Sequence, residues 1–366
     1  MRIVECINSL EAGGAQRLLV DLSNELSNTD EVVVLTLKNR KELKEDFYFP
    51  QISRKIQFLS LNLSDGFHIS YPIRIYKTIK RLRPDVVHIH CIVHYFLFTI
   101  LFYRKACYVQ TLHNEAEHGI VRYFRNIWKW LLKMEMLHVV TISQTNRESF
   151  QTFFNLTCDI LIYNGRKQPS KSEHHNVVTN FVKQLKKHPD DLLLLSIARG
   201  VPQKNIGMLI SAVNELAEKE RHLQLLLIGD YESNELGQQW MSMAGSTVHY
   251  LGVKDNIADY LYSCDAFCLS SLYEGMPITL IEALACRCIP ICTPCSGVVD
   301  VVKDGITGFI APSFSKEDYK QTILDFLQNR ERIDKEKLYN TYLSIFSIEL
   351  CSSQYMQLFR HLLIVE

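Results

Sequence analysis

The sequence lacks several features that would assign it to other classes of protein. Its 366 residues contain no run of eighteen uninterrupted apolar residues, so we expect nothing that spans a membrane. No internal repeat and no low-complexity tract occurs. Neither sign of charge is in excess, because Lys and Arg total 40 and Asp and Glu also total 40. This neutral balance argues against a general nucleic-acid binder, although it leaves room for a local basic patch.

Cysteine is present, but its pattern predicts neither disulfides nor a metal centre. The eleven cysteines are an odd number, and the N-terminus, MRIVECINSLEAGG, is typical of a strand and a glycine turn rather than a secretory signal. We therefore expect reduced thiols in a cytoplasmic protein. Cys286, Cys288, Cys292 and Cys295 lie close together, but their spacing does not match paired C-x2-C zinc ligands. Free cysteine also behaves as a small hydrophobe in a core.

Two motifs of nucleotide-binding enzymes are missing as well. The first expected strand, Arg2 to Ile7, is followed by Gly13-Gly14 in the stretch SLEAGGAQR and not by G-x-G-x-x-G. The dinucleotide fingerprint is therefore absent, and a dehydrogenase is poorly supported. No Asp-x-Asp follows a strand, so we expect no metal at a diphosphate. The glycine pair lets backbone amides approach an anion, although a plain turn explains it equally well.

What the sequence does contain is a series of short apolar runs that end in polar residues. Three of them lie in the first half of the chain, at 85–90, 108–114 and 139–143. Parallel strands that end at a common crevice have this form. A polar stretch over 166–190 follows, and a second series of apolar runs begins near Leu192. The pattern predicts an α/β protein, and the length suits two domains.

The most informative stretch runs from Ser270 to Thr293, with the sequence SSLYEGMPITLIEALACRCIPICT. An apolar run before it, a turn that contains Pro277, an apolar helical pattern and a second apolar run at 289–291 together predict a β-α-β unit. We place Pro277 at the first helical position, where its missing N–H costs nothing. The helix would then direct free backbone N–H groups at a ligand in the crevice above the strands.

Two glutamates, Glu274 and Glu282, mark this unit with seven residues between them. On their own they have two equally good interpretations. Either both bind a ligand, or Glu274 is only a partner of the helix dipole and Glu282 is only a solvated helix residue. Glu282, however, lies within the apolar segment LIEAL, and a half-buried carboxylate usually has a hydroxyl or cationic partner. The segment from Glu274 to Ala283 resembles the E-x7-E signature of the retaining glycosyltransferases of family four.

The resemblance implies a GT-B fold, in which two Rossmann-like domains face each other across a cleft. It covers essentially the whole chain and is strongest from Ser196 to Ile310. We expect an N-terminal acceptor-side domain at 1–165, a linker at 166–190 and a C-terminal nucleotide-sugar-binding domain at 191–345. A C-terminal helix at 346–366 would return to pack on the first domain.

The resemblance also assigns roles to two cations, Arg199 and Lys204, in an R-x4-K arrangement after the first strand of the second domain. There they would hold the donor diphosphate and stabilise the charge that grows on it, in place of a metal. Without that context, a solvated loop with two charges remains the alternative. The family implies that Glu274 bonds sugar hydroxyls and that Glu282 accepts from the ribose. It adds Gly275, Met276, Pro277 and Ile278 to the donor-binding loop.

Three further positions come from the same resemblance. Gly14 lies in a GGAQR segment, where Gln16 replaces the usual acid, and would allow close approach of the substrates. Thr111-Leu112-His113-Asn114 resembles a T-x-H-D/N element, so His113 would contact the donor sugar as an uncharged hydrogen-bond donor. Val253 ends a stretch that resembles the strand whose backbone holds the nucleobase. His90 ends a neighbouring strand, and for it a hydrogen-bonded structural role is favoured over a role in binding.

These residues together imply a metal-independent hexosyltransferase that moves a sugar from a UDP- or GDP-sugar to an acceptor hydroxyl with retention. Catalysis would rest on Arg199, Lys204, Glu274 and His113, without a cofactor. Envelope or capsular polysaccharide biosynthesis on a glycan or lipid-linked acceptor is the setting that the family implies. A nucleotide-sugar epimerase of the same fold and a non-catalytic partner subunit remain as alternatives. The sequence does not identify the sugar, the nucleotide, the acceptor or the oligomeric state.

One segment has the composition of a surface that contacts membranes. Residues 120–137, IVRYFRNIWKWLLKMEML, combine four basic residues with four aromatic ones in an amphipathic pattern. Such a helix suits an anionic lipid surface and predicts peripheral contact at the inner face of a membrane. A domain helix with one face in the core is the alternative, because long basic side chains also cover apolar surface.

Overall fold

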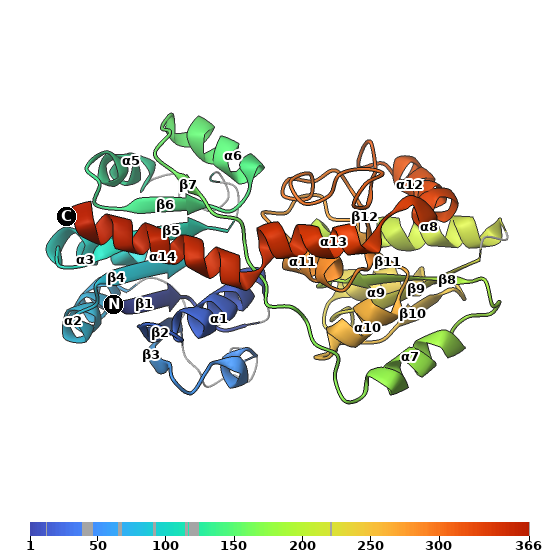
Figure 1. Ribbon diagram of the computed structural model, residues 1–366, viewed down its shortest axis with the longest axis horizontal. Helices are drawn as coiled ribbons and strands as arrows, with labels where there is room; N and C mark the ends of the chain where they lie inside the picture. The colour runs from blue at the N-terminus through green and yellow to red at the C-terminus, as the bar shows by residue number, and fades with distance from the viewer. Residues whose placement is uncertain are drawn as a thin grey trace. The chain divides into compact units, whose positions relative to one another are not determined.

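The computed structural model describes residues 1–11, 13–38, 47–64, 68–90, 93–113, 116, 124–219 and 222–365. The chain divides into two compact units (Figure 1). The first unit contains Met1–Lys167 together with Ile345–Glu366, and the second contains Gln168–Ser344. The C-terminal segment thus belongs to the same unit as the N-terminus, and most of the stretch expected as a linker belongs to the second unit.

The first unit is built on a seven-stranded sheet in the order β3-β2-β1-β4-β5-β6-β7, and every pair of neighbours is parallel. Its strands are β1 (Arg2–Ile7), β2 (Glu31–Lys38), β3 (Gln57–Leu63), β4 (Val86–His90), β5 (Cys107–Leu112), β6 (His138–Thr141) and β7 (Ile160–Leu161). The strand order reverses between β1 and β4. The carboxyl ends of all seven strands meet at one edge, which is where open parallel sheets bind their ligands.

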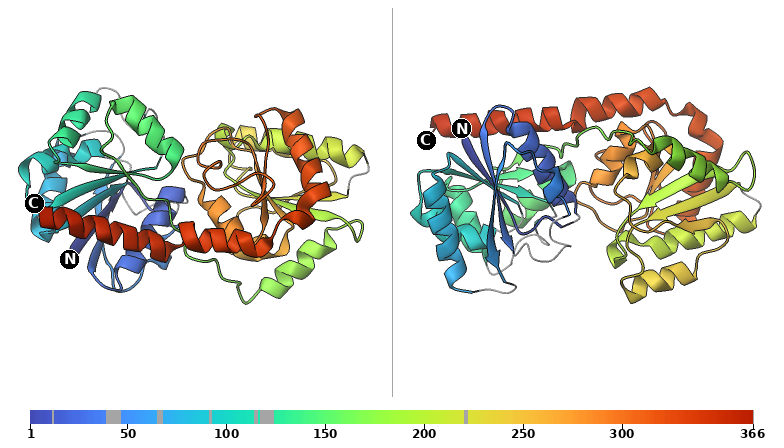
Figure 2. Two further views of the ribbon diagram at one scale, coloured as in Figure 1. Left: turned by 45° about the horizontal axis from the view of Figure 1, so that its top comes forward. Right: turned by 90° about the horizontal axis from the view of Figure 1, so that it is seen from below.

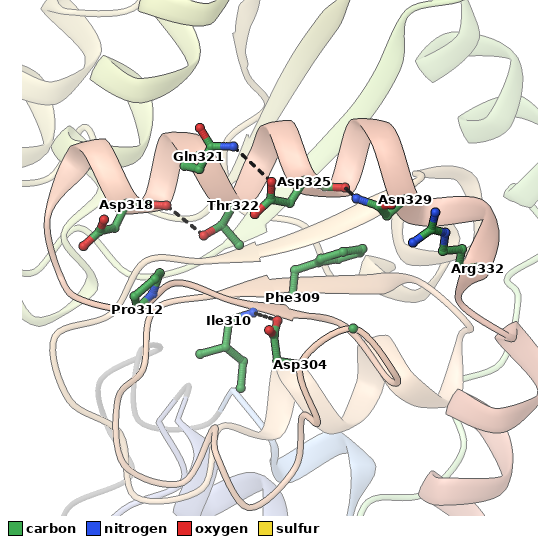
Figure 3. Close-up of a pocket in the computed structure, with 11 residues that line it drawn as sticks. Asp304, Phe309, Ile310, Pro312, Asp318, Gln321, Thr322, Asp325, Asn329 and Arg332 are labelled. Atoms are coloured by element: carbon green, nitrogen blue, oxygen red, sulfur yellow. Dashed lines mark hydrogen bonds between the residues drawn. The ribbon is translucent and has the colours of Figure 1, made fainter.

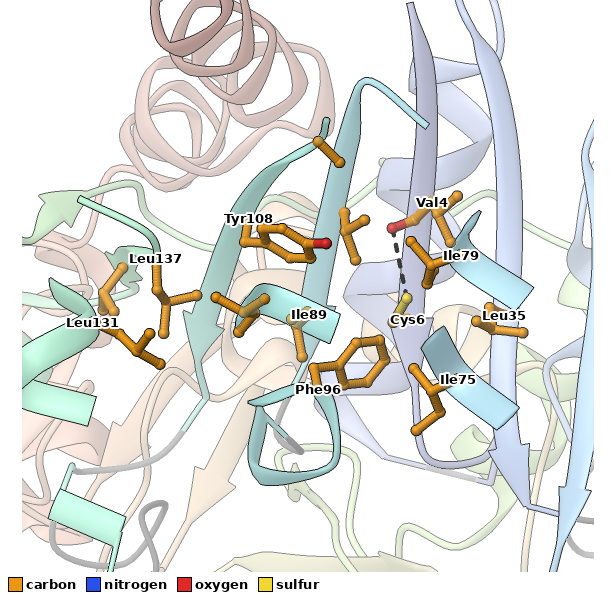
Figure 4. Packing of buried hydrophobic residues seen from close by; sticks show 14 of the residues in the cluster. Val4, Cys6, Leu35, Ile75, Ile79, Ile89, Phe96, Tyr108, Leu131 and Leu137 are labelled. Carbon is orange, nitrogen blue, oxygen red and sulfur yellow. Dashed lines mark hydrogen bonds between the residues drawn. The ribbon is translucent and has the colours of Figure 1, made fainter. Parts of the chain in front are cut away.

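Helices cover both faces of this sheet, because its strands are apolar on both sides (Figures 1 and 2). One face packs on α2 (Ser70–Leu82), α3 (Leu97–Phe102), α5 (Arg125–Lys133) and α6 (Gln144–Phe154). Figure 4 shows this layer, in which Cys6 and Ile89 of the sheet meet Ile75 and Phe96 of the helices. The other face packs on α1 (Gly14–Leu26) and α14 (Ile348–Val365). Successive strand residues alternate between the two layers, as a period of two requires.

The C-terminal helix α14 is part of the core of the first unit. Tyr355 and Phe359 are 0% exposed and pack with Leu18, Leu22 and strand residues of the same layer. Arg166, which contacts the segment before α14, forms a buried ion pair with Asp21 of α1 at 2.5 Å. The backbone N–H of Arg166 also donates to the carbonyl of Phe346 at 2.9 Å. These contacts fix α14 to the first sheet by packing and by hydrogen bonds.

The second unit has a six-stranded parallel sheet in the order β10-β9-β8-β11-β12-β13. Its strands are β8 (Leu192–Ile197), β9 (Leu223–Ile228), β10 (Val248–Tyr250), β11 (Ala266–Leu269), β12 (Ile289–Cys292) and β13 (Phe309–Ile310). The order reverses between β8 and β11. Its helices are α7 (His175–Gln184), α8 (Ile206–Glu218), α9 (Glu235–Ser242), α10 (Ile257–Ser263), α11 (Ile278–Ala285), α12 (Lys316–Asn329) and α13 (Lys335–Thr341).

The expected boundaries differ from the structure at several points. The helix α7 corresponds to the helix that the sequence predicts at 177–187 inside the linker stretch. It packs against α10, so this helix belongs to the second unit rather than to a linker. Pro277 is not the first helical residue but the N-cap of α11, with an extended ψ of 112°. The last helix begins at Ile348, after a π-helical turn at Tyr342–Phe346. The amphipathic segment expected at 120–137 is a nine-residue helix, and residues 120–123 lie outside the described part of the chain.

A pair of matched substitutions tests whether α14 stabilises the first unit. Phe359→Ala removes a fully buried ring from the first core, and Phe326→Ala removes one from α12 of the second unit. We expect each to lower the free energy of unfolding of its own unit by about 3–5 kcal/mol. Amide hydrogen exchange should then accelerate in β1, β4 and β5 for Phe359→Ala, but in β12 for Phe326→Ala. Equal acceleration of both sheets by either substitution would contradict this division of the core.

Candidate active site

The reversal of strand order in the second sheet brings two loops together. Ala266 and Phe267 of β11 pair with Leu194 and Leu195 of β8, although the two strands are far apart in the sequence. The loop after β8 contains Arg199 to Lys204, and the loop after β11 contains Ser270 to Pro277. Both loops therefore start from adjacent strand ends at the edge where parallel sheets bind ligands.

Hydrogen bonds join these two loops directly. The backbone N–H of Leu272 donates to the carbonyl of Gln203 at 2.8 Å. The amide of Gln203 donates to the carbonyl of Tyr273, and the hydroxyl of Ser270 donates to the carbonyl of Lys204, both at 2.8 Å. Because main-chain atoms take part in each contact, the relative position of the loops does not depend on flexible side chains alone.

A charged pair lies where the loops meet. Lys204 Nζ donates to Glu274 Oε1 at 2.5 Å, and Ser271 Oγ donates to the same oxygen at 2.6 Å. The side chains of Lys204 and Glu274 are only 19% and 9% exposed. Ser296 Oγ adds a hydrogen bond to the carbonyl of Glu274 at 2.8 Å. Two of the residues singled out from the sequence are therefore in contact, and the carboxylate already has a cationic partner before any ligand binds.

Arg199 differs from Lys204 in its surroundings. Its side chain is exposed, and no described residue is seen to pair with its guanidinium. Its backbone carbonyl accepts from the N–H of Val201 at 2.9 Å, which fixes the loop but not the side chain. The structure thus places one paired cation and one solvated cation on the same loop. A planar, always charged guanidinium suits bidentate contact with phosphate oxygens.

The predicted donor-binding loop continues into helix α11. Gly275 is half-buried, Met276 and Ile278 are 5% and 7% exposed, and Pro277 is buried between them. Glu282, inside the helix, is 3% exposed, so it is not the solvated residue of the alternative, and it is more deeply buried than the half-buried carboxylate expected from the sequence. Its packing leaves little surface for a ribose in this state.

A glycine on the neighbouring loop makes the close packing of this turn possible. Gly297 has a φ of +77°, and a Cβ at this position would lie 2.1 Å from the carbonyl oxygen of Gly275. Any other residue would therefore displace the backbone of the donor-binding loop. Pro294-Cys295-Ser296 precede Gly297, and burial together with the charge of Glu274 raises the pKa of Cys295 to about 12.

Val253 lies at a different part of the same edge. It is 61% exposed and follows Gly252, whose carbonyl accepts from the N–H of Gly229 at 3.1 Å. Gly229 has a φ of +154°, and a Cβ there would meet the carbonyl of Ala198 at 1.8 Å. Gly229, just after β9, therefore lies against both Gly252, which follows β10, and Ala198, which follows β8. Val253 is therefore on an exposed loop beside the Arg199 loop rather than in the core.

In the first unit, Gly14 and His113 follow the ends of β1 and β5. Gly14 is the exposed first residue of α1, and Gly13 before it is extended, with a φ of −176° and a ψ of 160°. His113 is half-buried, and its neighbour Asn114 lies outside the described residues. Burial, with help from His90 and His88, holds the pKa of His113 well below its usual range. His113 is therefore uncharged at neutral pH, as expected from the sequence.

A buried polar cluster that the sequence did not predict lies next to His113. Glu5, His88 and His90 are all 0% exposed and lie on β1 and β4, on the face that α14 covers. Glu5 accepts from both His88 and His90, and His90 contacts His113 at 2.8 Å. Burial alone would raise the pKa of Glu5, but the two histidines outweigh it and lower the pKa to about 2. Burial also lowers the pKa of His90 to about 4.

The structure gives His90 a positional role, because it links Glu5 to His113. No signal in the sequence marks Glu5, because a single acid within an apolar strand has no distinctive spacing. Only the register Glu5↔His88 across β1 and β4 brings these side chains together. The same three residues are also the only described group of three or more His, Cys, Asp or Glu side chains with the spacing of metal ligands.

The four clustered cysteines do not form such a group. Cys286, Cys288, Cys292 and Cys295 are buried free thiols at the end of α11, on β12 and just beyond it. Burial raises the pKa of Cys288 and of Cys292 well above the ordinary range. Neutral thiols in a dry core act as small apolar side chains.

A surface pocket of about 350 Å³ lies away from these residues, between α12 and the loop before β13 (Figure 3). Asp304, Asp318 and Asp325 line it, together with Arg332. Its acids are engaged within the protein, since Asp304 accepts from the N–H of Ile310 at 2.9 Å and Asp325 accepts from Gln321 at 3.0 Å. None of the residues singled out from the sequence lines it, so it does not bear on the site.

The helix expected to contact membranes has a mixed outer face. Trp128, Leu131 and Leu132 of α5 are buried, and Trp128 Nε1 donates to Gln110 at 3.0 Å. Trp130 and Met134 on the outer face are 47% and 55% exposed. The inner face of α5 is therefore a core face, as one of the two alternatives predicts, and contact of the outer face with a membrane stays a prediction. Within the described part of the chain, we find no helix with the length and apolar character needed to cross a membrane.

Sequence profiles of known families match both units. Residues 12–166 match the profile described as Glycosyltransferase Family 4, and residues 177–341 match the profile described as Glycosyl transferases group 1. Together the two matches cover nearly all of both units. The second match includes Arg199, Lys204, Glu274 and Glu282, and the first includes Gly14 and His113.

Individual relatives are similar over part or most of the chain. The N,N'-diacetylbacillosaminyl-diphospho-undecaprenol α-1,3-N-acetylgalactosaminyltransferase of Campylobacter jejuni is 27% identical over 38% of this chain and 36% of its own length. This chain thus aligns with only about a third of that relative. The capsular polysaccharide biosynthesis glycosyltransferase CapH of Staphylococcus aureus is 23% identical over 80% of this chain and 81% of its own length.

A solved structure confirms the fold. The crystal structure of HepE from Anabaena in complex with UDP and glucose superimposes with a TM-score of 0.78 at 15% identity. The superposition covers 99% of this chain and 100% of HepE. The predicted fold of two parallel-sheet α/β domains, GT-B, is therefore correct.

The two cations should differ in how much they stabilise the free protein. Lys204→Ala leaves the nearly buried carboxylate of Glu274 without its counter-charge, and we expect the second unit to lose about 1–3 kcal/mol. Arg199→Ala removes an exposed side chain and should change stability by less than about 0.5 kcal/mol. Urea unfolding, monitored by hydrogen exchange in β8 and β11, measures the change in stability of both variants. The double variant Lys204→Ala/Glu274→Gln should recover part of the loss, and equal losses for the two single variants would contradict the pairing.

Proposed function

This chain belongs to the family-four glycosyltransferases of the GT-B fold, and we propose that it transfers a sugar from a nucleoside diphosphate sugar to an acceptor hydroxyl with retention of configuration. The observation that carries the proposal is the contact between Lys204 and Glu274 at the reversal of the second sheet. It joins the two motifs that the sequence reading assigned to one donor. Arg199 lies on the same loop with its charge exposed to solvent.

The chemistry of these groups suits a diphosphate leaving group. Arg199 and Lys204 supply fixed positive charge where the departing diphosphate becomes more negative, which stabilises the transition state more than the ground state. The backbone N–H groups at the start of α11 add oriented dipoles. Glu274, held by Lys204 and Ser271, retains free lone pairs that accept from donor sugar hydroxyls. We assign Glu282 to the ribose hydroxyls, with a small movement of the packing around it.

The reaction that we propose breaks the bond between the anomeric carbon and the diphosphate oxygen. The acceptor oxygen forms its new bond on the same face of the sugar, and its proton passes to an oxygen of the departing diphosphate. No metal is needed for the charge balance, because the two cations stabilise the leaving group. His113, Gly14 and Val253 complete the assignment as contacts of the sugar, the acceptor side and the nucleobase.

The relatives support a donor and acceptor class. HepE was solved with UDP and glucose, and the name of the Campylobacter jejuni relative describes a sugar transfer to a diphospho-undecaprenol-linked acceptor. We therefore propose a UDP-sugar donor and a glycan or lipid-linked acceptor in polysaccharide biosynthesis, the process that the name of CapH also gives.

A lipid-linked acceptor would place the enzyme at a membrane surface, and the first unit has a surface of the right kind. We propose that the layer of α2, α3 and α5 contacts anionic lipid. Its outward apolar side chains are Ile73, Phe98, Leu101, Phe102, Ile127, Trp130 and Met134, each at least 37% exposed. Exposed basic residues, among them Arg125 and Lys133 of α5, lie beside them. Apolar insertion and attraction to anionic headgroups then act together.

Kinetics with the two cations test the transferase proposal. Because each cation stabilises charge that grows in the transition state, Lys204→Met and Arg199→Met should each lower kcat by about 10²- to 10³-fold. Lys183→Met, an exposed lysine of α7, serves as the matched control and should retain the rate. Nucleoside diphosphate release and mass spectrometry of the product measure turnover with a panel of UDP- and GDP-sugars. Addition of EDTA should leave the rate unchanged.

Three results would count against this function. Full kcat in Lys204→Met would remove the proposed role of the charge pair. An altered sugar still attached to its nucleotide would show an epimerase. If EDTA abolished activity and a divalent metal restored it, the metal and not the two cations would stabilise the leaving group.

Sedimentation with lipid vesicles tests the membrane surface. Trp130→Ser removes a large amphipathic side chain and should weaken binding to phosphatidylglycerol-containing vesicles by about 3- to 10-fold. Met243→Ser in the second unit, with a wild-type side chain that is 42% exposed, is the matched control and should bind as wild type does. Binding should also fall with salt, because part of it is electrostatic. Equal binding of the wild type to neutral vesicles at high salt would contradict the anionic surface.

A further inference from the structure

A chain of hydrogen bonds runs through the core of the first unit and ends at His113. It begins at Tyr355 of α14, whose hydroxyl lies 2.7 Å from Thr111 Oγ1. Thr111 Oγ1 lies 2.8 Å from His88 Nε2, and His88 Nδ1 lies 2.9 Å from Glu5 Oε2. The second half runs from the same carboxylate through His90 to His113. Residues on three strands and one helix therefore form one connected polar network.

The hydrogen positions in the half that reaches His113 follow from the acceptor at its start. An ionised carboxylate can only accept hydrogen bonds. His90 Nε2 lies 2.8 Å from Glu5 Oε2, so this nitrogen carries a hydrogen. A neutral imidazole has a single N–H, which leaves His90 Nδ1 as an acceptor. His113 Nε2 lies 2.8 Å from that atom and must therefore be the donor.

Neutrality of His90 is supported by its surroundings. The ring of His88 lies 4.2 Å from that of His90, measured between centroids, and the two share one carboxylate. Glu5 supplies one negative charge, so two charged rings would leave a positive charge uncompensated in a site with 0% exposure. Burial is the main cause that lowers the pKa of His90 to about 4, so His90 is a neutral ring at neutral pH.

We propose that Glu5 and His90 are positioning residues, which hold His113 as the Nε2–H tautomer and leave its Nδ1 as the acceptor for a hydroxyl of the bound substrate. The sequence reading expected an uncharged donor at His113, but the structure uses the only N–H of the neutral ring on His90. A sugar hydroxyl would then donate to His113 Nδ1 instead of accepting from the ring. The role of His113 toward substrate rests on the proposed function. The assignment of donors and acceptors within the network does not.

Which of the two rings donates in the hydrogen bond between His90 and His113 can be measured without any substrate. In the full-length protein with ¹⁵N-labelled histidine, the hydrogen between His90 and His113 should show one-bond coupling to His113 Nε2. A weaker coupling across the hydrogen bond should reach His90 Nδ1. The His113→Gln spectrum identifies the signals among the thirteen histidines. One-bond coupling of this hydrogen to His90 Nδ1 would reverse the direction and overturn the proposal.

A matched pair of substitutions tests the consequence for catalysis. His90→Asn and His90→Leu both remove the donor to Glu5, so both should destabilise the first unit to a similar extent. Only Asn retains an acceptor oxygen near the position of Nδ1 for His113. We expect His90→Leu to lower kcat/KM for the donor by about 10- to 100-fold relative to His90→Asn. Equal kcat/KM in two equally folded variants would show a purely structural role and overturn the proposal.

Three further measurements separate this inference from the proposed function. Tyr355→Phe interrupts only the half of the network that leads away from His113, so it should lower stability and retain kcat/KM. Normal kinetics in His113→Ala would refute the contact between His113 and substrate while leaving transferase activity established in the wild type. One equivalent of zinc held by Glu5, His88 and His90 would overturn the tautomer assignment, because the coordinating nitrogens would carry no hydrogen.

Discussion

Parallel pairing of the strands is the constraint on which the rest of this structure depends. In both sheets every neighbouring pair is parallel, so each sheet collects all its carboxyl ends at one edge. The reversal between β8 and β11 then sets two loops side by side that are about seventy residues apart in the sequence. The main-chain hydrogen bond from Leu272 to Gln203, and the ion pair of Lys204 with Glu274, are consequences of that pairing. Functional residues thus cluster because of topology and not because of local sequence.

The part of the site that the sequence could predict is the part that local spacing encodes. Glu274 to Glu282 lies within one turn-and-helix unit, and Arg199 with Lys204 lies on one loop, so each pair has a fixed separation along the chain. The exact place of Pro277 was not predictable in the same way. A proline fixes φ but leaves ψ free, and an extended ψ of 112° makes it the cap rather than the first residue of the helix.

Contacts that depend on register or on distant packing were beyond the sequence. Nothing in the sequence around Arg166 indicates its partner, and only the fold shows that it pairs with Asp21, 145 residues away. Arg287 occupies a left-handed position, with a φ of +60°, which costs a residue with a side chain more than it would cost glycine. Two hydrogen bonds to Glu336 and a cation–π contact with Tyr339 at 4.1 Å hold it there. Such pairs compensate a local cost with partners that no local pattern reveals.

The Glu5 network shows how packing and chemistry depend on one another in the first unit. Strands in a parallel sheet that is covered on both faces are normally apolar, and a carboxylate with 0% exposure is costly unless donors surround it. Glu5 has two, His88 and His90, and each of these rings has a second partner, so both are hydrogen-bonded at both nitrogens; the last histidine ring has one such partner within the described part of the chain. That last ring is His113, which lies past the end of β5 at the ligand-binding edge of the sheet. α14 contributes Tyr355 and the apolar cover that excludes water, so the C-terminal helix both completes the core and keeps the network dry. A dry network has few alternative hydrogen-bond arrangements, and this restriction is what allows a carboxylate on β1 to determine which nitrogen His113 presents to a ligand.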